Sequence, residues 1–131
     1  MRTLLVIAIV VFLSGTACNQ LPSGGDTGDP SRTVIGSPEE GRKLVTEKGC
    51  IACHTISSVP NALGAVGPVL DGVGDPTARP KIADGRLDNT PENIKTWLSD
   101  PPAVKSNTAM PNLGLSPQEI AHLAAFLQTL K

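Results

Sequence analysis

The stretch that decides the fold is Cys50-Ile51-Ala52-Cys53-His54. It places two thiols three positions apart and an imidazole directly after the second thiol. Gly49 precedes it, and the segment that follows is rich in glycine and proline. Thiols can bond to carbon or to a metal, and an imidazole can bind a metal. Their grouping within a few residues indicates that these side chains together bind one prosthetic group or metal.

Cys-x-x-Cys-His is the attachment signature of c-type haem. The two thiols can add to the two vinyl groups of one porphyrin, and His54 then lies under the iron as an axial ligand. Two other interpretations stay open. A thioredoxin-like dithiol expects a strand before the motif and a helix after it, and no period-2 strand pattern is visible. A zinc site needs further Cys or His at ligand spacing, and the only other histidine is His122. One covalent haem c is favoured.

The sixth position of the iron decides between electron transfer and catalysis. Met110 is the only methionine besides the initiator, and it lies in a loop before the last predicted helix, with Pro111 after it. A lone Met is otherwise most often a filler of the core. The position favours Met110 as the second axial ligand opposite His54. His122 is the alternative ligand, but it is expected as a solvated side chain on the helix surface.

Three helices are predicted from capping residues and apolar periodicity. The first begins at Ser37 and ends before Gly49, the second begins at Thr90 and ends within 99–102, and the third begins at Ser116. Ser37 and Ser116 are each followed three residues later by a glutamate, which is typical of a capping box. The third helix has an apolar stripe made of Ile120, Leu123, Ala124, Leu127 and Leu130. The expected fold class is all-α, with three to five helices and long loops wrapped around one haem.

Composition fits a small domain that is completed by a cofactor. The chain has 131 residues with only two Phe, one Trp and no Tyr, so a buried macrocycle would supply the large apolar group that the core lacks. The formal net charge is −1, from 11 basic and 12 acidic residues, and no basic patch occurs. This argues against nucleic acid and against electrostatic membrane binding. A monomer is expected.

The N-terminal part has the layout of an export signal. Arg2 is followed by an apolar run over 4–13, then by small residues that end at Cys18. The run is shorter than the roughly 20 residues that span a bilayer. We therefore expect a signal peptide over 1–17, of the lipoprotein type, with Cys18 lipidated. Cleavage by an ordinary signal peptidase and an uncleaved anchor are the alternatives.

The segment after the signal is rich in Gly, Pro, Ser and Asp, which is typical of a flexible linker. The expected organisation is a tether over 18–36 and a haem domain over 37–131. The protein is expected outside the cytoplasm, in the periplasm or on the outer face of the cytoplasmic membrane, held there by its lipid.

Residues 37–131 resemble class I c-type cytochromes, the mono-haem cytochromes c. The segment 82–111 is especially similar to the cytochrome c domain of bacterial haem–copper oxidase subunit II, whose copper-ligand domain has no counterpart here. The matching pieces, in chain order, are Gly41, residues 50–54, Gly67-Pro68-Val69-Leu70, Asn89-Thr90-Pro91-Glu92-Asn93, Trp97-Leu98, Met110-Pro111 and the Leu-rich last helix.

The resemblance implies further roles near the haem. The carbonyl of Pro68 would accept a hydrogen bond from His54 and so fix the imidazole. Leu70 would pack on the haem, and Asn89 and Trp97 would approach a propionate. The resemblance also implies that Gly41 permits a close crossing of the first and last helices, with Val45 meeting Leu123 and Phe126. The segment 75–81 is longer than the oxidase pattern, which leaves the match of Arg79 to a propionate-binding arginine open.

The function implied is that of an electron-transfer protein, not an enzyme. It would carry single electrons from a quinol-oxidising complex to a terminal oxidase. The alternatives are a cytochrome subunit of a larger redox complex, and a haem enzyme or sensor with a labile sixth ligand.

Overall fold

The computed structural model describes residues 34–131. The predicted signal peptide over 1–17, the lipidation site at Cys18 and the tether up to residue 33 lie outside the described residues. Among the described residues, no helix is long and apolar enough to cross a membrane.

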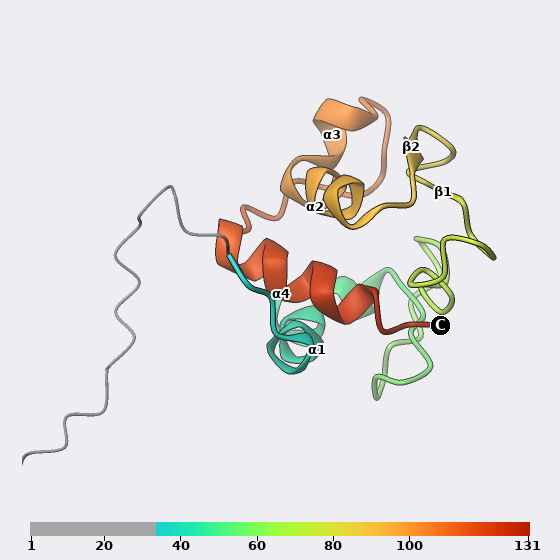
Figure 1. Cartoon of the computed structure of the whole chain (residues 1–131). Helices are drawn as coiled ribbons and strands as arrows, with labels where there is room; N and C mark the ends of the chain where they lie inside the picture. The colour runs from blue at the N-terminus through green and yellow to red at the C-terminus, as the bar shows by residue number, and fades with distance from the viewer. Residues whose placement is uncertain (1–33) are drawn as a thin grey trace, which may run out of the picture. The chain divides into compact units, whose positions relative to one another are not determined.

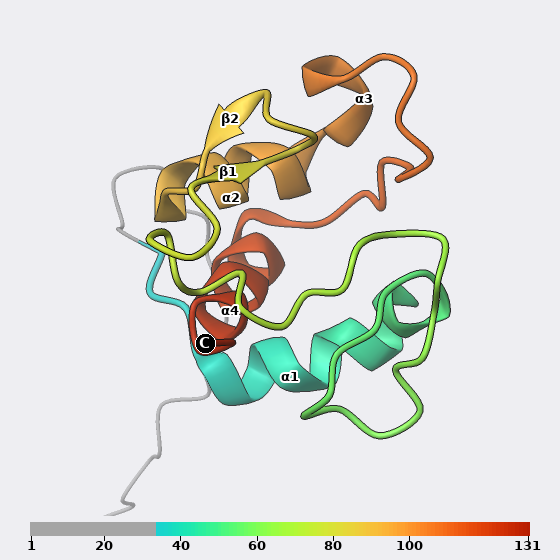
Figure 2. The same ribbon diagram turned by 90° about the vertical axis from the view of Figure 1, so that its right-hand side faces the viewer.

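Four α-helices form the body of the domain, and α4 runs between α1 on one side and α2 on the other (Figure 1). The view along α4 shows the same order (Figure 2). The elements are α1 (Pro38–Glu47), η1 (Cys50–Ala52), β1 (Lys81–Ile82), β2 (Leu87–Asp88), α2 (Pro91–Ser99), α3 (Pro101–Val104) and α4 (Pro117–Leu127). The predicted all-α fold is confirmed.

The capping signal of α4 forms as predicted. Ser116 Oγ accepts a hydrogen bond from the backbone N–H of Glu119 at 3.3 Å, and the Glu119 carboxylate accepts one from the backbone N–H of Ser116 at 2.8 Å. Lys48, at the end of α1, lies 2.6 Å from the same carboxylate. The hydrogen bond from Lys48 and those from Ser116 lower the pKa of Glu119 to about 2.

The capping box predicted for α1 forms only in part. Ser37 Oγ accepts from the backbone N–H of Glu40 at 3.4 Å, but the Glu40 carboxylate pairs with Lys43. The backbone N–H of Ser37 donates instead to Nδ1 of His122 on α4, at 2.8 Å. The prediction of His122 as a solvated side chain is therefore wrong: it is half-buried and joins α4 to the first turn of α1. A contact between residues so far apart in sequence leaves no trace in local capping patterns.

The crossing of α1 and α4 depends on Gly41, as expected. A Cβ added to Gly41 would lie 2.1 Å from the His122 carbonyl oxygen and 2.7 Å from Phe126 Cβ. One turn further along α1, Val45 is 1% exposed. It belongs to the buried core with the α4 residues Leu123, Ala124, Phe126 and Leu127.

Three local features differ from the sequence expectations. Residues Lys81–Ile82 and Leu87–Asp88 form a two-residue antiparallel ladder, which is too short to show alternation. Asp100 caps the single-turn helix α3, directly after α2 ends. The folded body also begins before Ser37, because a Cβ on Gly36 would lie 2.1 Å from the Ala121 carbonyl oxygen. The last residues of the predicted tether therefore pack against α4.

Candidate functional site

The Cys-x-x-Cys-His motif lies on a tight turn that follows α1. Gly49 adopts the left-handed conformation with φ 75°, which lets the chain turn sharply into η1. The backbone N–H of His54 then donates to the Cys50 carbonyl at 2.9 Å. Both cysteine side chains are half-buried, and burial raises the pKa of the Cys50 thiol. A helix, not a strand, precedes the motif, so the frame of a thioredoxin-like dithiol is not formed.

His54 is oriented by a backbone carbonyl. Its Nδ1 donates to the carbonyl oxygen of Pro68 at 2.8 Å, as the resemblance implied. This bond places the proton on Nδ1 and leaves the lone pair of Nε2 free for a metal. Gly67 forms the wall against which the ring lies, since a Cβ there would be 2.4 Å from His54 Cε1. The imidazole thus has a fixed tautomer and a fixed plane.

Backbone contacts hold the loop 55–70 against the motif. The N–H of Gly67 donates to the Cys53 carbonyl at 2.7 Å, and the N–H of Leu70 donates to the Thr55 carbonyl at 2.9 Å. Gly64 packs so closely that a Cβ would lie 2.5 Å from the carbonyl carbon of Cys53. The glycines of this loop were apparent from the sequence. The contact of Gly67 with the imidazole of His54 is apparent only in the structure.

Met110 and Leu70 are half-buried and pack against the same core as Cys50. The backbone N–H of Met110 donates to Thr108 Oγ1 at 3.2 Å, which holds the turn that presents the thioether. Figure 2 shows the segment 105–116 and the segment 50–70 on the same side of α4. The ligation of iron by Met110 and the packing of Leu70 on haem stay predictions.

Asn89 and Arg79 have structural partners in the protein. Asn89 is 7% exposed, and its side-chain amide donates to the carbonyls of Val73 and Arg79, each at 2.8 Å. The Arg79 guanidinium donates to the Val69 carbonyl at 2.9 Å. Both N–H groups of Asn89 are thus used to join two loops. Trp97 is half-buried on α2. The predicted approach of Asn89 and Trp97 to a propionate stays a prediction.

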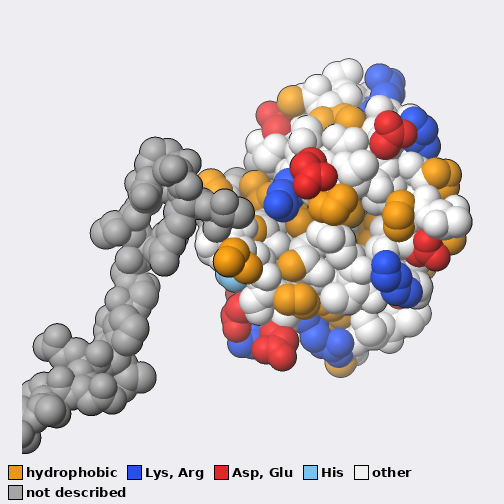
Figure 3. Space-filling view, viewed as in Figure 1, with side chains coloured by type: hydrophobic (Ala, Val, Ile, Leu, Met, Phe, Trp, Pro, Cys, Tyr) orange, Lys and Arg blue, Asp and Glu red, His pale blue; other side chains and the backbone are white. Residues whose placement is uncertain are grey.

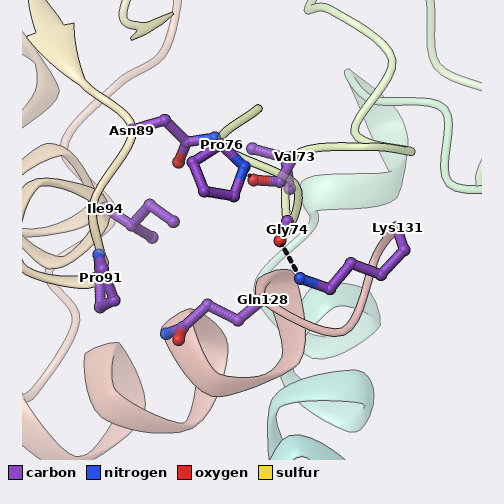
Figure 4. Close-up of a pocket in the computed structure, with 8 residues that line it drawn as sticks. All are labelled: Val73, Gly74, Pro76, Asn89, Pro91, Ile94, Gln128 and Lys131. Atoms are coloured by element: carbon purple, nitrogen blue, oxygen red, sulfur yellow. Dashed lines mark hydrogen bonds between the residues drawn. The ribbon is translucent and has the colours of Figure 1, made fainter. Parts of the chain in front are cut away.

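A small cavity of about 230 Å³ lies where the start of α2 meets the end of α4, apart from the motif (Figure 4). The side chain of Lys131 closes one side of it by donating to the carbonyl of Gly74. Its lining residues are Val73, Gly74, Pro76, Asn89, Pro91, Ile94, Gln128 and Lys131. None of them belongs to the motif or to the Met110 loop.

The chain belongs to the cytochrome c family, whose model, described as cytochrome c, matches residues 38–131. Cytochrome c oxidase subunit 2 of Alkalihalophilus pseudofirmus is 32% identical over 104 residues, which are 79% of this chain and 28% of that protein. The same subunit of Bacillus subtilis is 33% identical over 99 residues, 71% of this chain and 26% of the relative. The chain therefore spans about a quarter of the length of these relatives.

A solved structure has the same fold. The crystal structure of SoxXA from P. pantotrophus superposes with a TM-score of 0.58 at 26% identity, covering 74% of this chain and 83% of that one. With the paired thiols, the oriented imidazole and its glycine wall, these matches define a class I c-type cytochrome that carries a covalently bound haem c. Electron transfer is the activity that this family implies.

Proposed function

We propose that this cytochrome carries single electrons between respiratory complexes and delivers them to a terminal oxidase. The observation that carries the proposal is the orientation of His54, whose Nδ1–H is held by the Pro68 carbonyl at 2.8 Å. A histidine fixed in this way keeps its position whatever the charge of the iron, and a small geometric change favours fast electron transfer. The similarity to oxidase subunit 2 supports the oxidase as acceptor.

Bound haem c supplies an iron that changes its charge by one electron. The protein would contribute two ligands to the iron, His54 and Met110, and would keep substrates away from the metal. With His54 on one side and Met110 on the other, the iron would have no open position, and the thioether would raise the potential relative to a second histidine. A protein with that ligand set would carry electrons and would not act as a catalyst.

We also propose that the protein is exported and anchored to the membrane. The layout of residues 1–18 supports a lipoprotein signal with a diacylated Cys18, and two acyl chains would hold the domain firmly on the outer face of the membrane. Replacing Cys18 by Ser should move the cytochrome from the membrane fraction to the soluble fraction. A wild-type protein that is already soluble in its native host would leave a plain secreted cytochrome.

A second candidate is a permanent cytochrome subunit of a larger complex. Two observations favour it: the relatives have a similar segment as about a quarter of a longer oxidase subunit, and the superposed structure is that of SoxXA. Gel filtration of detergent-solubilised membranes separates the two candidates. A free carrier should elute alone, whereas a subunit should elute with other redox proteins.

The acceptor is tested by stopped-flow mixing of the ferrous holo-protein with membranes of its native host. We expect oxidation that cyanide abolishes, because cyanide blocks the haem–copper centre of a terminal oxidase. Ferrous protein that the membranes leave reduced would contradict the proposed acceptor. Ferrous protein that instead forms a stable adduct with carbon monoxide would contradict the carrier function as a whole.

A further inference from the structure

Lys105 is the one charged residue of the segment 105–116, which carries Met110. It lies at the end of α3, and no charged residue follows it in the sequence before Glu119. Its ammonium group donates a hydrogen bond to the carboxylate of Asp84 and forms an ion pair with it. Asp84 lies in the turn between β1 and β2, so this pair joins the hairpin to the segment that carries Met110 (Figure 2).

Backbone hydrogen bonds connect Lys105 to α3 and to Met110. The N–H of Lys105 donates to the Pro101 carbonyl at 2.9 Å. The carbonyl of Lys105 accepts from the N–H of Thr108 at 3.0 Å, and Thr108 Oγ1 accepts from the N–H of Met110 at 3.2 Å. The contact that holds the side chain of Lys105 therefore bears on the position of the Met110 backbone.

The turn that presents Asp84 has an uncommon backbone conformation. Three successive residues have a positive φ, which is 52° at Ala83, 53° at Asp84 and 84° at Gly85. Glycine adopts this left-handed conformation freely and aspartate more readily than most residues, whereas it is unfavourable for alanine. Backbone strain of this kind persists where surrounding contacts hold it, and it is concentrated at functional sites. The ion pair with Lys105 is such a contact.

The charges around the turn are paired locally. The hydrogen bond and the positive charge of Lys105, with a smaller effect of Arg86, hold the pKa of the Asp84 carboxyl below its ordinary value. Lys81 of the same hairpin pairs instead with Asp88, at 2.6 Å. On the face drawn in Figure 3, side chains of both signs are scattered among uncharged ones. The nearby carboxylate, and not a broad field, therefore determines where the Lys105 ammonium group lies.

We propose that Asp84 is a positioning residue for Met110: through Lys105 it holds the segment 105–116 closed, so that other molecules do not replace the thioether on the iron. This role rests on the proposed function, because it presupposes Met110 as a ligand. The molecules excluded are small neutral bases such as imidazole, which bind a metal where a coordination position opens. The ion pair thereby favours electron transfer over reactions at the iron.

Imidazole titration of the full-length ferric holo-protein at about pH 8, where most imidazole is uncharged, tests this role. Imidazole that displaces the thioether removes the charge-transfer band expected of Met110 ligation, so the loss of the band reports the affinity. Asp84→Asn should raise the affinity for imidazole about two- to fivefold, the range expected of an ion pair at the surface. Asparagine adopts the left-handed conformation as aspartate does, so the turn should be kept.

Asp88→Asn is the matched control. It removes a carboxylate from the other ion pair of the same hairpin and changes the net charge equally, and it should leave the affinity unchanged. Added salt should raise the affinity of the wild type and of the control, but not that of Asp84→Asn, because salt weakens the ion pair. Lys105→Gln should match Asp84→Asn, and the double variant should bind imidazole no more tightly than either single variant.

Hydrogen exchange of the holo-protein gives a second measurement that needs no added ligand. The amides of Thr108 and Met110 should exchange about two- to fivefold faster in Asp84→Asn than in Asp88→Asn, because the segment opens more often. Equal exchange rates in the two variants would contradict the positioning role.

The titration separates the role of Asp84 from the ligation by Met110. Equal affinities of Asp84→Asn and Asp88→Asn for imidazole, with the band present in the wild type, would overturn the positioning role and leave Met110 as the ligand. A ferric wild type that lacks the band would overturn the ligation and the positioning role together.

Discussion

The α1–α4 pair and the loop 55–70 are held in place by different means. In the helix pair, polar side chains reach across the packed contact: Lys48 pairs with Glu119, and His122 accepts from Ser37. In the loop, the backbone of Gly67 and the wall it forms hold His54. Changes in the helix pair should therefore alter stability and leave the iron site intact, whereas changes in and beside the loop should alter the iron site.

The largest effect is expected from Cys50→Ala combined with Cys53→Ala. No other pair of thiols in the chain has the required spacing, so covalent haem should be lost entirely. The measurement is the pyridine haemochrome spectrum of denatured, reduced protein. A c-type spectrum in the double variant would refute the assignment of the motif.

The two regions differ most clearly in the role of one glycine in each. Gly41→Ala places a methyl group against the His122 carbonyl, and such overpacking should lower the free energy of unfolding by about 1–3 kcal/mol. Gly67→Ala places the methyl group against the imidazole of His54. It should shift the haem spectrum, which Gly41→Ala should not. Denaturant melts and visible spectra of both variants test these expectations. Identical spectra for the two variants would show that the two glycines do not differ in their effect on the haem site.

Substitution of His122 tests the contact that joins the start of α1 to α4. His122→Leu leaves the Ser37 N–H without an acceptor and should cost about 1–3 kcal/mol. His122→Asn is the matched variant, because its side-chain oxygen lies near the place of Nδ1 and should restore much of the loss. Neither variant should change the visible spectrum. A spectral change would mean that His122 affects the iron.

Glu119 gives a smaller effect with a defined pH dependence. Its pKa is lowered from 4.5 to about 2 in the folded protein, so its contribution to stability is present above pH 4.5 and is lost as the pH falls towards 2. Glu119→Gln keeps a side-chain oxygen that can accept from the Ser116 N–H but removes the charge that pairs with Lys48. It should therefore cost about 0.2–1 kcal/mol near neutral pH and should cost little below the lowered pKa. Urea melts of both proteins at several pH values measure the difference in their free energies of unfolding. A difference that stays constant between pH 4.5 and pH 2 would contradict the expected pH dependence.

Local sequence signals predicted those parts of the fold that depend on local contacts. The caps at Ser37, Thr90 and Ser116 all appear in the structure. The crossing at Gly41, which the family resemblance implied, appears as well. His122 could not be placed from the sequence, because its partner Ser37 is brought to it only when α1 and α4 pack.

The candidate site also has features that were predicted from the sequence and features that were not. The motif and the His54–Pro68 bond followed from spacing and from family resemblance. The donors of Asn89 are instead bound by two loop carbonyls, which depends on the path of two loops and not on any motif.

The proposed carrier function depends on Met110 as a ligand of the iron together with His54, and absorption spectroscopy of the oxidised holo-protein is the direct test. With Met110 as a ligand, we expect a weak charge-transfer band near the red end of the visible spectrum, which Met110→Ala removes. The variant should also have a lower potential and bind carbon monoxide when reduced, because a coordination position has opened. A wild-type protein that lacks the band, or that binds carbon monoxide readily at neutral pH, would show that Met110 is not a ligand of the iron.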